Sequence, residues 1–157
     1  MKLALTTAAL VLAVTSALAQ TTSMKMEEVP AAVRAAGVAA ARGGNIDSVQ
    51  LELERGMAIY EFKVTMPDRK KMEVDVDHTG RVEEVEEVVE RTAVPPAAMQ
   101  ALMRVLPKFE PTLIERSTRH NFEIYYEFEG KDSRGTEIDV EVRADGKVIL
   151  IADDTAN

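Results

Sequence analysis

The fold of this chain is decided most clearly by residues 72–82, which read Met-Glu-Val-Asp-Val-Asp-His-Thr-Gly-Arg-Val. Apolar and acidic residues alternate up to Asp77, and a period of two is typical of a β-strand with one buried face and one wet face. The residues that follow end in Gly80, which suits a tight turn, and Val82 then starts a new apolar run. The stretch therefore predicts two antiparallel strands joined by a short turn.

The same pattern returns later in the chain. Residues 138–148 read Ile-Asp-Val-Glu-Val-Arg-Ala-Asp-Gly-Lys-Val, and the Tyr-Glu-Phe of residues 60–62 recurs at 126–128. Val-Pro-Ala-Ala at 29–32 likewise recurs as Val-Pro-Pro-Ala at 94–97. A repeat with a nearly fixed period indicates two copies of one supersecondary unit.

Each copy is predicted to begin with a helix at its Val-Pro start and to continue with four strands that alternate in hydrophobicity. We therefore expect an α+β fold of two tandem α-β-β-β-β units, at residues 20–90 and 91–157, each a helix packed on an antiparallel sheet. Segment 83–93 is ambiguous, because its valines also have helical spacing; we interpret it as a strand followed by a linker. The pattern leaves open whether the two sheets join edge to edge.

A leader precedes the repeats. Lys2 gives a short positive region, residues 3–14 are almost wholly apolar or small, and Ala17-Leu18-Ala19 offers a cleavage site. This apolar run is shorter than the roughly 20 residues that a membrane-spanning helix needs. We expect residues 1–19 to be a signal peptide and the protein to be periplasmic or secreted, with no membrane anchor after cleavage.

Composition narrows the choice of partners. The chain has 27 acidic and 19 basic side chains, a formal net charge of −8 at pH 7, and no cysteine. The charge argues against nucleic acid, whose phosphates require a basic surface. Without disulfides, the fold must depend on its hydrophobic core. We expect a protein partner, either a protease or another protein with a basic surface; the charge also leaves cations and basic peptides open as partners.

The repeated motifs resemble the PepSY family of small exported domains. The resemblance is carried by the Val-Pro-Ala-Ala helix, the Tyr-Glu-Phe strand and the hairpin of residues 74–82, and the first copy matches better than the second. The tandem arrangement looks like the PepSY-like group related in fold to beta-lactamase-inhibitory protein. The resemblance implies a noncatalytic α/β protein outside the cytoplasm, of a kind proposed in some relatives to restrain proteases; it does not imply inhibition of a beta-lactamase.

The sequence gives little support to an enzyme. It has no cysteine nucleophile and no Gly-x-Ser-x-Gly elbow. His78 and His120 both fall in predicted turns, where a general base would be mobile and solvated. We therefore expect a noncatalytic protein that needs no cofactor.

The wet face of the predicted strands carries an unusual density of carboxylates. Neighbouring strands lie about 5 Å apart, so these groups should repel one another unless a cation or a basic partner compensates. One interpretation is a solvated face that discourages aggregation, and the other is a docking surface with Tyr125 as its aromatic anchor. The candidate partner-binding residues are Glu61, Glu73, Asp75, Asp77, Glu123, Tyr125, Glu127, Glu137, Asp139 and Glu141.

A calcium loop is the alternative. Asp75, Asp77, Thr79 and Glu86 stand at positions one, three, five and twelve of an EF-hand-like spacing, with Gly80 at position six. Residues 71–77 nevertheless alternate like a strand, where an EF-hand has a helix. The second copy also lacks the closing glutamate. Calcium or another cation therefore stays as the alternative ligand, held by this loop or by the wider acidic face of the sheet.

Overall fold

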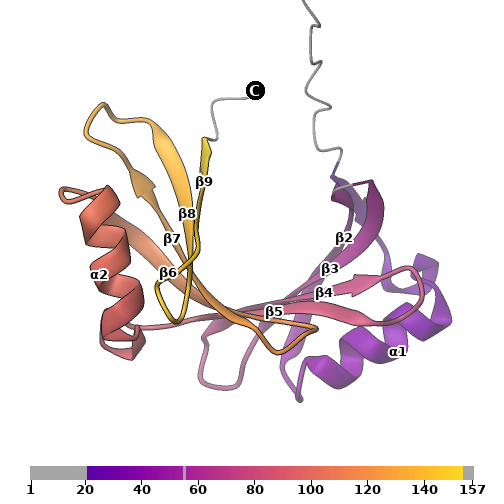
Figure 1. The fold of residues 1–157 in the computed structure, drawn as a ribbon. Coiled ribbons are helices and arrows are strands. Elements are labelled where there is room, and N and C mark those ends of the chain that lie inside the picture. Colours follow the sequence, from indigo (N-terminus) through magenta and orange to yellow (C-terminus); the bar gives the residue numbers. More distant parts are fainter. Residues whose placement is uncertain (1–20, 55, 154–157) are drawn as a thin grey trace, which may run out of the picture.

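The computed structural model describes residues 21–54 and 56–153, and within these ranges the chain forms one nine-stranded antiparallel sheet and two ten-residue α-helices (Figure 1). The predicted signal peptide, residues 1–19, lies outside the described residues. Neither α-helix in these ranges is long and apolar enough to cross a membrane.

The elements follow one another in a simple order. They are β1 (Thr22–Met24), a 3-10 turn η1 (Met26–Glu28), α1 (Ala31–Ala40), β2 (Asn45–Glu54), β3 (Met57–Thr65), β4 (Lys71–Asp77), β5 (Val82–Val88), a 3-10 turn η2 (Arg91–Ala93), α2 (Pro96–Val105), β6 (Glu110–Arg119), β7 (Ile124–Lys131), β8 (Glu137–Arg143) and β9 (Ile149–Asp153). The strand order in the sheet is the same as the order in the chain. The prediction of a strand at the start of segment 83–93 is confirmed by β5.

The predicted fold class of two tandem α-β-β-β-β units is wrong, because one continuous, mostly-β sheet runs through both copies. Strands β5 and β6 pair directly, with Glu84 opposite Arg119 and Val88 opposite Glu115. An unpaired edge on either side would expose a row of backbone N–H and C=O groups, and this pairing satisfies both rows. The repeat period reveals two copies of the sequence, but it contains no information on whether their edges stay apart.

The sheet bends into a deep curve, and both helices lie on its outer, convex side (Figure 1). Helix α1 lies against β4 and β5, whereas α2 lies against β8. The concave side carries no helix in the described part of the chain (Figure 1). Side chains on that side are therefore not covered by a helix.

Alternate residues of the strands supply the core under each helix. The N-terminal half, β1–β5 with α1, has one buried cluster, and the C-terminal half, α2 with β6–β9, has another. The N-terminal cluster contains Val29, Val33, Ala41, Val49, Phe62, Val64, Met72, Val74 and Val76. The C-terminal cluster contains Val94, Ala98, Ala101, Leu102, Phe109, Ile114, Tyr126, Phe128, Ile138, Val140 and Val142. The intervening residues of these strands point to the concave side.

Two glycine turns fix the helices against the sheet. Gly80, between β4 and β5, has φ 90°, and Gly146, between β8 and β9, has φ 70°. A Cβ atom at Gly80 would lie 3.1 Å from the backbone of Ala32, and one at Gly146 only 2.5 Å from the carbonyl oxygen of Ala97. Only glycine combines this backbone conformation with so close an approach to a helix start.

Candidate functional site

The strand register joins the polar residues of both copies into one surface on the concave side. Directly paired residues share a face of the sheet, and one such row runs from Glu61 through Asp75 and Glu84 to Arg119. A neighbouring row contains Glu73, which pairs with Glu86. We call this surface the acidic face; its carboxylates are Glu61, Glu73, Asp75, Glu84, Glu86, Glu115, Glu127, Glu129, Asp139 and Glu141.

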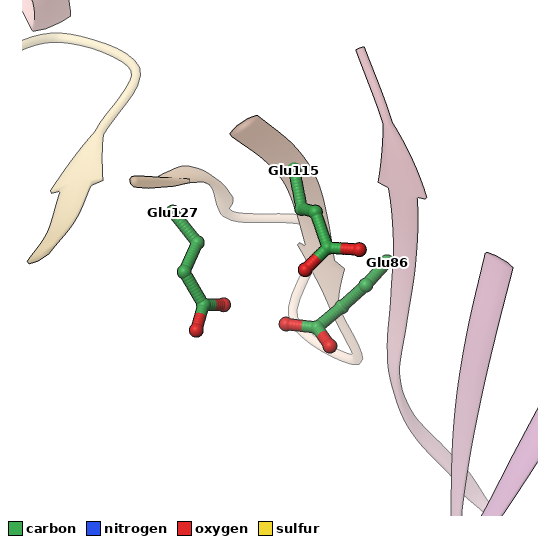
Figure 2. A group of neighbouring side chains, drawn as sticks. All are labelled: Glu86, Glu115 and Glu127. Atoms are coloured by element: carbon green, nitrogen blue, oxygen red, sulfur yellow. The ribbon is translucent and has the colours of Figure 1, made fainter. Parts of the chain in front are cut away.

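Three carboxylates converge at the centre of the acidic face (Figure 2). Glu86 comes from β5, Glu115 from β6 and Glu127 from β7, and one oxygen of each lies within 4.8 Å of the others. We call these three residues the central glutamates. They belong to both halves, so the site exists only because β5 and β6 pair.

Burial and mutual repulsion perturb these groups. Burial is the largest cause, and it raises the pKa of Glu115 to about 7, with repulsion from Glu73 adding to the effect. The pKa values of Glu86 and Glu127 are also raised well above the ordinary range, first by burial and then by neighbouring carboxylates. These three carboxyl groups therefore hold their protons more strongly than exposed glutamates do.

The two halves differ in the cation that they supply to this face. In the N-terminal half, Lys63 Nζ lies 3.2 Å from Glu61 Oε1 and 3.4 Å from Glu73 Oε1. The corresponding positions in the second copy are Glu127, Glu129 and Asp139, so a carboxylate replaces the lysine. The register preserves the arrangement, because Lys63 pairs with Glu73 and Glu129 pairs with Asp139.

Arg119 is the cation of the acidic face at the junction of the halves. Its Nε lies 3.2 Å from Glu84 Oε1, and its guanidinium also contacts Glu141. The same guanidinium lies over the ring of Tyr125, 4.0 Å from its centre. Tyr125, the predicted aromatic anchor, is 6% exposed, so a partner would reach its ring only after Arg119 moves.

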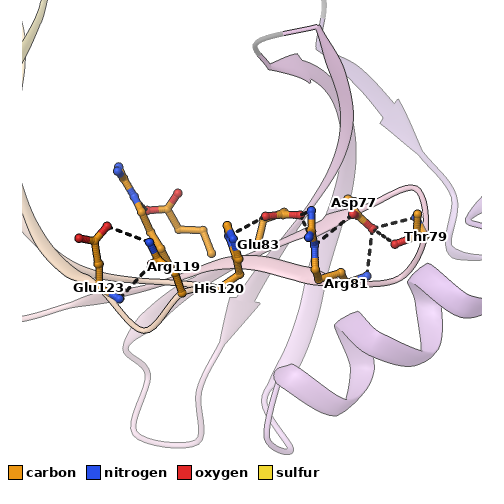
Figure 3. A network of polar contacts seen from close by, with 9 residues as sticks. Asp77, Thr79, Arg81, Glu83, Arg119, His120 and Glu123 are labelled. Atoms are coloured by element: carbon orange, nitrogen blue, oxygen red, sulfur yellow. Dashed lines mark hydrogen bonds and ion pairs between the residues drawn. The ribbon is translucent and has the colours of Figure 1, made fainter.

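The predicted calcium loop does not gather its residues. Asp77 is buried, and its Oδ1 accepts hydrogen bonds from the Thr79 hydroxyl (2.6 Å) and from the backbone N–H groups of Thr79 (2.8 Å) and Arg81 (3.0 Å) (Figure 3). These donors hold the pKa of Asp77 well below its usual range. Glu86 instead pairs with Glu73 and turns its carboxylate to the central glutamates, so Asp77 stabilises the turn while Glu86 belongs to another cluster.

The remaining predicted residues lie at the ends of the C-terminal strands. Glu123 stands beside the β6–β7 turn, where its Oε1 is 3.4 Å from Arg143 Nη1. Glu137 begins β8 and lies 2.9 Å from Lys131 Nζ. His120 Nδ1 lies 2.9 Å from Glu83 Oε2, and its side chain is half-exposed (Figure 3).

Sequence reasoning missed Glu84 and Glu115. Glu115 alternates with Ser117 and Arg119 along β6, and this polar alternation is the signal that would have placed it on the wet face. The signal is weak because a bulge between Pro111 and Leu113 shifts the register just before it. Its proximity to Glu86 could be found only from the β5–β6 pairing.

Comparisons with known proteins define the fold and go no further. No family model matches the sequence, and a search of curated proteins finds no match. The structure is similar to the crystal structure of a DUF2874 family protein from Bacteroides uniformis, with a TM-score of 0.61 and 16% sequence identity over 79% of this chain and 88% of that chain. Such a low identity shows a shared fold alone, so the PepSY resemblance remains a prediction from the sequence.

Proposed function

We propose that this chain is an exported, noncatalytic protein that binds a basic protein surface through its acidic face. The observation that carries the proposal is the excess of carboxylates over built-in cations on the concave side, where Lys63 and Arg119 serve only part of the acidic face. A surface with one sign of charge attracts partners of the opposite sign over a distance and speeds their association.

The shape of the sheet supports the same proposal. The concave side bends around an open space that neither helix covers (Figure 1). A convex basic surface on a protease would fit this curvature. Binding there would restrain the protease by covering its active site, which is the role that the PepSY resemblance implies.

An exposed aromatic residue is the sequence neighbour of one predicted partner-binding residue. Phe122, in the turn between β6 and β7, is 87% exposed and has a positive φ of 64°. It precedes Glu123, one of the predicted partner-binding residues. Aromatic side chains often contribute most to binding energy at interfaces, so Phe122 is a more accessible anchor than Tyr125.

The test is cross-linking capture of a partner from the extracytoplasmic fraction, followed by affinity measurements with the purified pair. We expect a folded variant with reversed charges on the acidic face to lose the partner. The affinity of the wild-type protein for the partner should fall as the salt concentration rises. The four substitutions in this variant are Glu61→Lys, Asp75→Lys, Glu127→Lys and Asp139→Lys.

A matched control separates the acidic face from net charge. It carries four reversals at exposed carboxylates outside the acidic face, and it should keep the partner. These substitutions are Glu27→Lys, Glu28→Lys, Glu90→Lys and Glu110→Lys. Equal capture by the wild type and the acidic-face variant, or an affinity that does not change with salt, would contradict the proposal.

A further inference from the structure

Glu115 is an unusual carboxylate even within the acidic face. Its residue is 8% exposed, and its side chain is directed toward Glu86 (Figure 2). None of the hydrogen bonds or ion pairs found among the described residues involves its carboxylate. A buried charge without such a partner is costly, so this position needs a counter-ion from outside the chain or a proton.

The comparison of the two halves indicates a cation independently. Where Glu61 and Glu73 share the ammonium of Lys63, their counterparts Glu127 and Asp139 have Glu129 in its place. Asp139 interacts directly with Glu127, and its Oδ1 is buried and accepts no hydrogen bond within the described ranges. The C-terminal half thus keeps the carboxylates of the first half and lacks their cation.

From these two observations we propose that the central glutamates and Asp139 bind one calcium ion. Carboxylate oxygens are the ligands that calcium prefers, at about 2.3–2.6 Å from the ion. Oxygens on opposite sides of one ion are then about 5 Å apart, and the oxygens of the central glutamates lie within 4.8 Å of one another. A divalent ion also offsets two of the four carboxylate charges, whereas a single ammonium offsets one.

The calcium site goes beyond the proposed function, and calcium binding would affect partner binding. An ion bound at the centre would reduce the negative charge that attracts a basic partner. By linkage, the partner would weaken calcium binding by the same factor that calcium weakens partner binding. Calcium would therefore act as a negative regulator of the acidic face.

The first measurement is the melting temperature of the chelator-treated protein, with calcium chloride, magnesium chloride or sodium chloride added at equal ionic strength. We expect about 5 mM calcium to raise the melting temperature by several degrees, because a ligand that binds only the folded state stabilises it. Magnesium should have a smaller effect, since it requires shorter, octahedral coordination. Titration calorimetry should give one calcium per chain.

Two variants make the test specific. Glu115→Gln removes one charge from a repelling group, so without calcium it should melt at the wild-type temperature or above, while the response to calcium is lost. Glu110→Gln, an exposed position on the same strand, should respond to calcium like the wild type. A disrupted fold would lower the melting temperature of Glu115→Gln both with and without calcium. An unchanged or higher melting temperature without calcium, together with a lost response to calcium, therefore cannot come from misfolding.

Three results would overturn the calcium site. They are the absence of a calcium-dependent rise in the wild type, an equal rise in Glu115→Gln, and an equal rise with sodium chloride. The carboxyl groups would then hold only protons. A partner that is still captured through the acidic face would leave the proposed function intact, so the two proposals fail separately.

Discussion

The two halves of the sheet share one backbone plan and differ in charge and packing. Both keep a glycine at the turn under the helix start, at Gly80 and Gly146, because the backbone approaches too closely for any side chain. On the concave side, by contrast, Lys63 in one half is replaced by Glu129 in the other. Close backbone contacts thus constrain the residue, whereas a solvent-facing strand position tolerates a reversal of charge.

The two hydrophobic cores also differ, in how the space between helix and sheet is filled. In α1, Gly37 lies over Phe62, and an added Cβ would be 2.5 Å from the Phe62 Cζ atom. The corresponding residue of α2 is Leu102, which is fully buried in the cluster that contains Phe128. One half brings the helix close to an aromatic ring through a glycine, and the other fills the space with a leucine. The following predictions test how strictly each solution is required.

The largest effect is expected at the leucine. Leu102→Ala should lower the free energy of unfolding by about 2–5 kcal/mol, because it removes buried apolar contacts and leaves a cavity. Gly37→Ala should lower it by about 1–3 kcal/mol, because the new methyl group forces the Phe62 ring to shift. Urea unfolding of both variants measures the difference. A stabilising Gly37→Ala, as helix propensity alone would give, would show that the close contact is unimportant.

The second largest effect is expected at the glycine turns. Gly146→Ala should destabilise the protein by about 1–3 kcal/mol, since alanine would combine a positive φ with a contact to the Ala97 carbonyl oxygen. Gly80→Ala should cost less, because the nearest backbone atom is 3.1 Å away and not 2.5 Å. Thermal unfolding of the pair gives the ranking, and the reverse order would contradict the role assigned to the Ala97 contact.

A charge exchange between the halves should have a smaller effect. Lys63→Glu removes the ion pairs with Glu61 and Glu73 and should destabilise the protein by about 1 kcal/mol. Glu129→Lys places an ammonium at the equivalent position and should stabilise it by about 0.5 kcal/mol while abolishing the response to calcium. Both changes should shrink in high salt. Equal melting temperatures for the two variants would show that the exchange of Lys63 for Glu129 does not explain a difference in stability between the halves.

The smallest effect concerns the acidic residues of the two turns. Hydrogen bonds to Asp77 depress its pKa, and the contact with Arg143 lowers the pKa of Asp145 to about 2. A depressed carboxyl pKa contributes stability above the ordinary value of 3.8, and this contribution is lost as pH falls toward the folded-state pKa. Melting temperatures between about pH 5 and pH 2 should therefore fall less steeply in Asp77→Asn than in the wild type.

Asp145→Asn provides the comparison for this pH series. Asp145 is exposed, whereas Asp77 is buried, so solvent screening should make the effect at Asp145 smaller. Identical pH curves for the wild type and Asp77→Asn would mean that the turn does not depend on the charge of Asp77.

Much of the local structure could be predicted from the sequence. The period-two alternation of residues 72–77 and the turn at Gly80 predict a hairpin, and β4 and β5 form it. The pairing of β5 with β6 could not be predicted, because alternation shows which face a residue occupies and not which strand lies beside it. For the same reason Glu127 could be placed on a wet face, whereas its convergence with Glu115 could not.

The order of the strands has a consequence for how the chain folds. Each strand pairs with the strands that precede and follow it in sequence, and most of these pairs are closed by short turns. Proteins dominated by such local contacts fold faster than β proteins with distant pairings. Because synthesis proceeds from the N-terminus, β1 to β5 can pair before β6 is made, and the growing sheet then offers β5 as the template for the second half.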